Sequence, residues 1–162
     1  MMNIKIICVG KIKEPALQSL CGEHLKRLSK YAKLEIIELQ DEKLPATLSE
    51  KQILDIQKIE SEKIIQKINK LGKCSVILLD LNGVELDSKE FSSKLQNLAT
   101  YENSTIVFVI GGSLGMSPSL LQKPYLKICF SKMTFPHQLI RVFLLEQIFR
   151  AFKIQNNETY HH

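Results

Sequence analysis

The sequence lacks the features that mark several common classes of protein. Its four cysteines, Cys8, Cys21, Cys74 and Cys129, show no CxxC spacing and mostly lie in apolar runs. This pattern favours neither a zinc site nor a disulfide framework, so we expect reduced, buried thiols. The sequence has no apolar stretch of 18 residues, and its amino terminus is interrupted too soon for a signal peptide. We therefore expect a cytoplasmic protein without a membrane-spanning segment.

Signatures of several enzyme classes are also absent. No Gly-Lys-Ser/Thr follows a glycine loop, which excludes a P-loop, and no Ser/His/Asp, Cys/His or paired-carboxylate arrangement supports hydrolysis. The glycine loop at 111–115 has GGxxG spacing and follows the fourth expected strand, whereas a Rossmann fingerprint is GxGxxG after the first strand. This spacing therefore disfavours a nucleotide-dependent oxidoreductase.

Length and charge set broader limits. The 162 residues suit one domain spanning residues 1–162, and 44% hydrophobic with 24% charged residues is ordinary globular composition. Lysine and arginine outnumber aspartate and glutamate by 22 to 17, which gives a net charge of +5. This charge mildly favours polyanionic partners, but many proteins with such a balance bind no nucleic acid. The lysines are scattered along the chain, so they do not decide whether the protein binds nucleic acid.

Apolar runs rich in β-branched residues predict five strands, with helices between them. We expect the strands at residues 4–9, 34–39, 75–80, 105–110 and 126–130, and the longer helices at about 15–31, 49–69, 88–99 and 136–153. Ser49 with Gln52 predicts a capping box, and Asn82-Gly83 predicts a turn. The alternation predicts an α/β domain with a five-strand, largely parallel sheet flanked by helices.

Two loops in the last third form the candidate binding site. The fourth strand leads into the glycine loop at 111–115, and the fifth leads into residues 131–137. Ligands of open α/β sheets bind at the carboxyl ends of strands, so we expect both loops to wrap one small molecule. Alone, the glycine loop is equally typical of a tight turn. Ser131, Thr134 and Pro136 are likewise typical of a helix N-cap.

The last helix is apolar over most of its circumference, with 11 apolar residues among the 17 from Gln138 to Ile154. Such a helix needs two buried faces. A homodimer interface supplies the second face, and the alternative is a central helix enclosed within one chain. Arg141 and Arg150 are candidates for contact with an RNA phosphate, although Arg150 also has the spacing of a surface ion pair with Glu146.

Five ordered motifs span the chain. They are IKIICVGK at 4–11, LDLNG at 79–83, FVIGGSLG at 108–115, FSKMTFPHQ at 130–138 and EQIFRAFK at 146–153. Together with Arg141 and the closing Tyr160-His161, they closely resemble the ribosomal RNA large subunit methyltransferase H family. The resemblance implies a SPOUT-type α/β knot with a C-terminal trefoil knot, although chains generally do not thread their own loops.

The resemblance also implies function. It implies a homodimer that uses S-adenosylmethionine, without a metal, to methylate N3 of a pseudouridine in the large-subunit ribosomal RNA of the assembled ribosome. The runner-up is a noncatalytic ribosome-binding protein of the same fold.

By position, the family's functional residues fall into two sets. The cofactor set carried over by the resemblance is Leu79, Gly111, Phe130, Ser131, Lys132, Met133, Thr134 and Phe135. The set implied for catalysis and the RNA site is Arg150, Tyr160 and His161. His162 stands where the family often has arginine or lysine, which removes a permanent positive charge because histidine is mostly neutral at pH 7.

Overall fold

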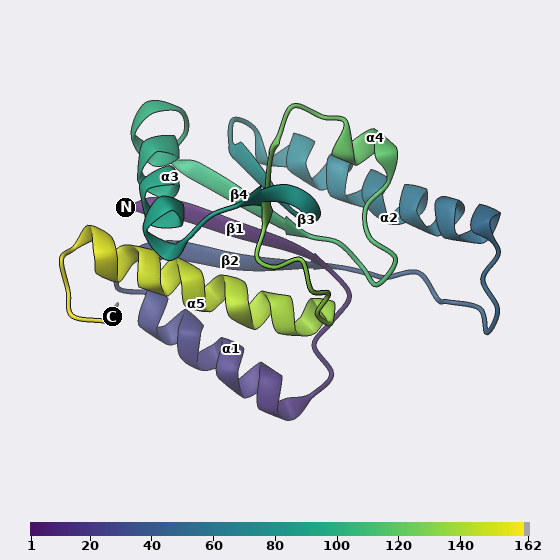
Figure 1. Ribbon diagram of the computed structural model, residues 1–162, viewed down its shortest axis with the longest axis horizontal. Coiled ribbons are helices and arrows are strands. Elements are labelled where there is room, and N and C mark those ends of the chain that lie inside the picture. The colour runs from purple at the N-terminus through teal and green to yellow at the C-terminus, as the bar shows by residue number, and fades with distance from the viewer. Residues whose placement is uncertain (161–162) are drawn as a thin grey trace.

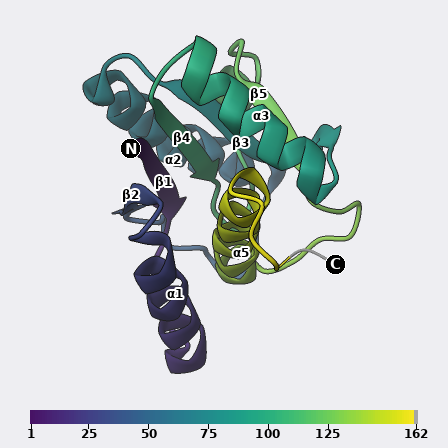
Figure 2. The same ribbon diagram turned by 90° about the vertical axis from the view of Figure 1, so that its left-hand side faces the viewer.

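The computed structural model describes residues 1–160 and has a parallel sheet between two layers of helices (Figures 1 and 2). The strand order is β2-β1-β4-β3-β5, and every neighbouring pair is parallel. The predicted α/β fold with a five-strand sheet flanked by helices is therefore confirmed. The elements are β1 (Met2–Val9), α1 (Pro15–Leu28), β2 (Ala32–Leu39), α2 (Glu50–Leu71), β3 (Ser75–Glu85), α3 (Ser88–Tyr101), β4 (Thr105–Ile110), α4 (Pro118–Leu121), β5 (Leu126–Cys129) and α5 (His137–Gln155).

Local chemistry sets several of these boundaries. The predicted capping box begins α2, where the Ser49 side chain accepts from the Gln52 amide and the Gln52 side chain accepts from the Ser49 amide. Asp87 and Glu90 form the same reciprocal pair at the start of α3. Each box satisfies two backbone donors that a helix amino terminus leaves without intrahelical partners.

The central strand β4 is buried on both faces. Ile106 and Phe108 pack with α1, α3 and α5, whereas Val107 and Val109 pack with α2 and α4 on the opposite face. This alternation follows from the two-residue period of a strand, and it explains why the run is apolar throughout. Each fully buried side chain of this size contributes about 1.5–3 kcal/mol.

The structure corrects the reasoning about α5. This helix lies against the sheet between α1 and α3 (Figures 1 and 2). Its buried residues include Val142, Leu145, Ile148 and Phe152. The sheet, α1 and α3 cover α5 on three sides within one chain, so much of its apolar circumference is buried without a second copy, and the homodimer stays a prediction. Phe143 differs from these residues because 37% of it remains exposed.

The predicted turn at Asn82-Gly83 is wrong. These residues belong to β3, which carries a bulge because Leu79 and Val84 both pair with Ile128 of β5. A Cβ on Gly83 would lie 2.7 Å from backbone atoms of β5, so only glycine permits this close approach. The chain leaves the sheet between the two pairings and returns to it.

Two further predictions concern the whole chain. All four cysteines are free thiols; three are buried, and Cys74 is partly exposed. Burial raises the pKa of the Cys8 thiol to about 12, so Cys8 is inert as a nucleophile at neutral pH. Among the described residues, no helix combines the length and the apolar character needed to cross a membrane.

Candidate active site

The two predicted loops meet at one edge of the sheet. β4 ends at Ile110 and β5 ends at Cys129, with β3 between them. Because the three strands are parallel, their carboxyl ends reach the same edge, beside the start of α5. The loops and the bulge of β3 enclose a cavity of about 350 Å³. Cavities of about 300–1,000 Å³ commonly hold small molecules.

Most of the predicted cofactor residues line this cavity, which we call the edge cavity. Lys132 is the exception among the eight, because it is exposed and lies outside the lining. The seven that line it are Leu79, Gly111, Phe130, Ser131, Met133, Thr134 and Phe135. The fold thus brings together residues from the bulge of β3 and from the ends of β4 and β5, which lie far apart in sequence. Their individual roles in binding stay predictions.

Sequence reasoning missed other residues that line the edge cavity. Asp80 and Leu81 reach it from the bulge of β3, and Ile140 reaches it from the first turn of α5, beside His137 of the predicted loop. Asp80 directly follows an apolar run, and this position at a strand end was the signal that could have identified it. Its carboxylate can accept hydrogen bonds from ligand hydroxyl groups. Burial and the nearby Arg141 lower the pKa of His137, so its imidazole is neutral at neutral pH.

The glycine loop has a shape that other residues would resist. The Gly115 amide donates to the Gly112 carbonyl at 3.0 Å, and Gly115 has a φ of +81°, which L side chains rarely adopt. A Cβ on Gly112 would lie 2.7 Å from Oε1 of Glu60. The glycine loop is therefore a tight turn, and the same turn forms one wall of the edge cavity.

The second loop is held by its own polar groups. The Ser131 hydroxyl accepts from the Met133 amide at 3.0 Å, and the Cys129 thiol donates to the Ser131 carbonyl at 2.9 Å. Pro136 occupies the cap position of α5, and no side chain caps the helix there. The N-cap interpretation of Ser131 and Thr134 is therefore wrong, since α5 begins only at His137.

Arg141 is not placed to contact RNA. Only 4% of this residue is exposed, and its guanidinium donates to Glu38 at 2.8 Å and to the Gly10 carbonyl at 3.1 Å. These bonds fasten the amino-terminal part of α5 to the carboxyl ends of β1 and β2. The prediction that Arg141 can contact an RNA phosphate is wrong, because its guanidinium is buried and both terminal nitrogens are hydrogen-bonded inside the protein.

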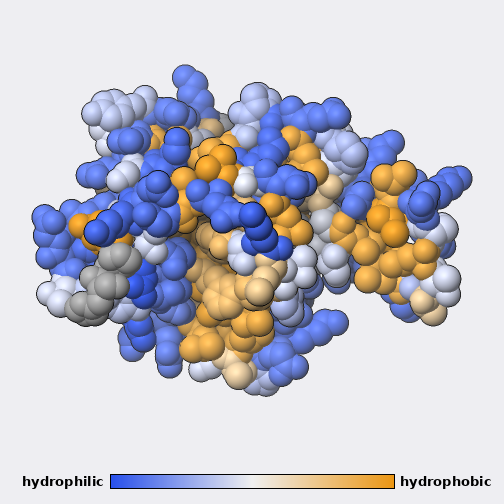
Figure 3. Space-filling model, viewed as in Figure 1, coloured by the Kyte–Doolittle hydropathy of each residue, from blue (hydrophilic) through white to orange (hydrophobic). Residues whose placement is uncertain are grey.

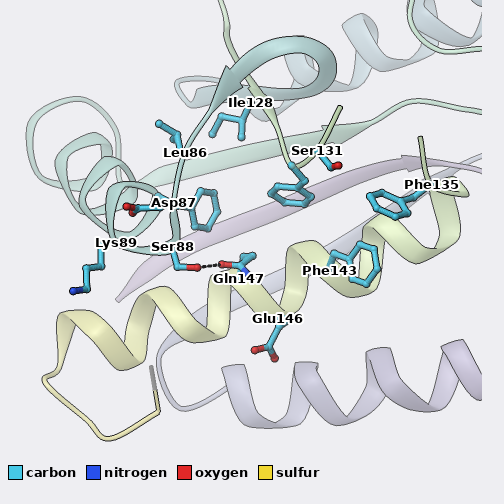
Figure 4. Close-up of a pocket in the computed structure, with 12 residues that line it drawn as sticks. Leu86, Asp87, Ser88, Lys89, Ile128, Ser131, Phe135, Phe143, Glu146 and Gln147 are labelled. Carbon is cyan, nitrogen blue, oxygen red and sulfur yellow. Dashed lines mark hydrogen bonds between the residues drawn. The ribbon is translucent and has the colours of Figure 1, made fainter. Parts of the chain in front are cut away.

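A second cavity of about 670 Å³ lies between the start of α3 and α5 (Figure 4). It shares Ile128, Phe130, Ser131 and Phe135 with the edge cavity, so the end of β5 and the loop after it separate the two spaces. Phe135 meets Phe143 edge to face, with ring centroids 5.4 Å apart. We call this second space the α3–α5 cavity.

Arg150 and Tyr160 both contact the side chain of Glu146 on α5. The guanidinium of Arg150 donates to Glu146 at 2.9 Å and lies 4.8 Å from the centre of the Tyr160 ring. The Tyr160 hydroxyl also donates to Glu146, at 3.0 Å. Burial and the Glu146 carboxylate raise the pKa of Tyr160, so its phenol stays protonated. The predicted ion pair of Glu146 with Arg150 is confirmed.

Glu146 is among the residues that line the α3–α5 cavity, but its carboxylate, which holds the cluster, points away from the other lining residues toward α1 (Figure 4). Neither Arg150 nor Tyr160 lines the edge cavity. The structure therefore brings two of the three predicted catalytic residues together, but outside the edge cavity that most of the predicted cofactor residues line. The third, His161, lies outside the described residues.

Comparison with known proteins identifies the family. The family model described as "Predicted SPOUT methyltransferase" matches residues 2–161. The chain belongs to the SPOUT methyltransferase family. It is 52% identical over 160 residues to proteins of Clostridium perfringens and Clostridium tetani, with 99% of each chain covered. Both are named "Ribosomal RNA large subunit methyltransferase H", so the predicted resemblance is confirmed.

Solved structures support the SPOUT methyltransferase fold. A probable methylase family protein from Haemophilus influenzae matches with a TM-score of 0.52 at 14% identity. A putative methyltransferase from Legionella pneumophila, in complex with the bound cofactor SAM, matches with a TM-score of 0.52 at 10% identity. The alignments cover 95% and 93% of this chain but only 66% of each neighbour. At such low identity, these likenesses support the fold alone.

The walls of the edge cavity have the chemistry of a site for a nucleoside-type ligand. Phe130 and Phe135 supply apolar surface, and Asp80 supplies an acceptor. Gly111 and Gly112 leave backbone uncovered by side chains at the cavity wall. Within residues 1–160, no three His, Cys, Asp or Glu side chains are grouped to hold a metal ion.

Proposed function

We propose that this protein transfers a methyl group from S-adenosylmethionine to the large-subunit ribosomal RNA, in the cytoplasm. The observation that carries the proposal is that seven of the eight predicted cofactor residues, from β3 and from the segments after β4 and β5, line one cavity. The names of relatives 52% identical over nearly the whole chain support a ribosomal RNA substrate. The net charge of +5 suits an RNA partner, whose phosphate contacts would make binding strongly dependent on salt.

The edge cavity fits the proposed cofactor. We assign the cofactor contacts to Leu79, Gly111 and the loop at 130–135, with Asp80 as an acceptor for hydroxyl groups. When bound, S-adenosylmethionine supplies a methyl group already activated on its sulfonium sulfur. The protein therefore needs no metal and acts by orienting the acceptor atom in line with this methyl group and by excluding water.

We further propose N3 of a pseudouridine as the acceptor within the assembled ribosome. Its proton must leave, and positive groups nearby lower the cost of the resulting anion. We assign this role to His161 or a neighbouring positive group, with Arg150 holding a phosphate or the base. Glu146 supports the assignment because it fixes the guanidinium of Arg150 and the phenol of Tyr160 in one place.

A homodimer is part of the proposal, although the burial of α5 does not require one. Figure 3 shows hydrophobic surface across the centre of the molecule, with hydrophilic margins. Exposed apolar residues border both cavities: Leu81, Met133, Phe135 and Phe143 are exposed by 53%, 73%, 39% and 37%. Apolar surface gathered around candidate sites is typical of an interface. Light scattering of the wild type and of Phe143→Asp tests the homodimer: the wild type should be dimeric and the variant more monomeric. A monomeric wild type would refute the homodimer.

The decisive experiment measures methyl transfer from labelled cofactor to intact ribosomes and to free ribosomal RNA, with the modified nucleotide mapped. We expect transfer to the ribosome, at a pseudouridine. Calorimetry with S-adenosylmethionine distinguishes the runner-up, because a noncatalytic ribosome-binding protein would not bind the cofactor. His161→Ala should reduce transfer and spare cofactor binding, and retained turnover would reject the role of His161.

A further inference from the structure

Helix α2 supports the glycine loop from the side opposite the edge cavity. Nε2 of Gln57 donates to the Leu114 carbonyl at 2.6 Å. The Ser61 hydroxyl, on a side chain only 1% exposed, accepts from the backbone amide of Ser117 at 2.8 Å. These two bonds hold the loop near its end, at Leu114, and just beyond it, at Ser117.

A third side chain of α2 contacts the start of the loop. Oε1 of Glu60 lies 2.7 Å from the place where a Cβ on Gly112 would be, so carboxylate and backbone are in close contact. Oε2 of Glu60 accepts from the Glu42 amide at 2.9 Å, which ties the segment after β2 to the same point. Glu60 is 4% exposed, and burial raises the pKa of its carboxyl group.

The three side chains act from one face of α2. Residues 57, 60 and 61 are spaced by three and four positions, which places them together on a helix. None of them lines the edge cavity, whereas every residue from Gly111 to Met116 does. The loop is therefore a thin wall with the cavity on one side and α2 on the other.

We propose that Gln57, Glu60 and Ser61 are positioning residues that hold the glycine loop in its cofactor-binding shape. This inference rests on the proposed function, because it takes the edge cavity to be the cofactor pocket. Glycines give a loop many alternative conformations, and ordering such a loop at the moment of binding reduces affinity. Side chains that fix the loop beforehand remove this cost without touching the ligand.

The test compares Gln57 with Gln66, an exposed glutamine on the same helix. Gln57→Met keeps the length of the side chain and removes the donor, and Gln57→Glu directs a carboxylate at the Leu114 carbonyl. Gln66→Met and Gln66→Glu are the matched controls. We expect calorimetry to show a Kd for S-adenosylmethionine about 3- to 10-fold higher in Gln57→Met, the worth of one hydrogen bond, and higher still in Gln57→Glu. The Gln66 variants should bind like the wild type.

A second measurement separates positioning from general loss of structure. Hydrogen exchange at the Gly115 amide reports opening of the loop, because this amide bonds the Gly112 carbonyl. We expect faster exchange in Gln57→Met than in Gln66→Met at equal Tm, with slow exchange restored by saturating cofactor. The KM for ribosomes should not change, since α2 is assigned no RNA contact.

The outcomes distinguish two failures. If the wild type binds cofactor and the Gln57 variants bind it equally well, the positioning role is refuted and the proposed function stands. If the wild type does not bind cofactor, the proposed function fails and the inference falls with it. If Gln57→Glu is unstable, Gln57→Met with the exchange measurement still decides the question.

Discussion

Replacing Gly83 by alanine tests the account of the bulge in β3. The added Cβ would lie 2.7 Å from the Ile128 nitrogen, the Ile128 carbonyl carbon and the Lys127 carbonyl carbon, whereas ordinary contact begins at 3.4 Å. All three are backbone atoms, so no side chain can rotate away, and β3 and β5 must separate by about the difference. Overpacking of this kind costs about 1–3 kcal/mol. For a chain of this size, each kcal/mol of stability lost lowers the Tm by about 3 °C, so we expect the Tm to fall by about 3–9 °C.

Urea denaturation at one fixed protein concentration measures the effect, because self-association would make the apparent stability depend on concentration. Gly22→Ala is the matched control, since a Cβ there meets nothing within 4 Å and the residue lies inside α1. It should stabilise the protein by about 0.5–1 kcal/mol. A Gly83→Ala variant as stable as the wild type would refute the close approach of the two strands.

Three other substitutions have expected outcomes. The raised pKa of Glu60 means that the folded state holds the proton more tightly than the unfolded state, so wild-type stability is lost as pH rises through the folded pKa. The stability of Glu60→Gln relative to the wild type should therefore increase as the pH rises above 4.5 in a series of urea titrations, and a difference that stays constant with pH would contradict this. Arg141→Met should lose about 2–4 kcal/mol, because it removes the bonds to Glu38 and to the end of β1, and cofactor calorimetry should show weaker binding too. Tyr160→Phe should reduce methyl transfer about 5-fold by losing its bond to Glu146, with cofactor Kd unchanged.

The sequence predicted those features that depend on neighbouring residues. Runs of β-branched residues marked the strands, and Ser49 with Gln52 marked the start of α2 because a capping box closes within four residues. The edge cavity was also predictable, since parallel strands must release their loops at one edge. The seven lining residues named beforehand came from the family resemblance and agree with that placement.

Features that depend on distant segments were not predictable in this way. Asn82-Gly83 has the composition of a turn, and only the backbone of β5 beside Gly83 makes it part of a bulge. Arg141 looks like an exposed cation until the fold brings Glu38 to it. The enclosure of α5 likewise needs α1 and α3, whose packing partners the apolar pattern does not specify.

The wall between the two cavities has a thermodynamic consequence. Four residues belong to both linings, so these side chains cannot change position for one occupant without changing the space offered to the other; they are Ile128, Phe130, Ser131 and Phe135. Any occupant that selects one arrangement of this wall alters the affinity of the neighbouring space, and linkage requires the effect to be equal in both directions. Ligands bound in both cavities would therefore influence each other's affinity through the end of β5 and the loop that follows it.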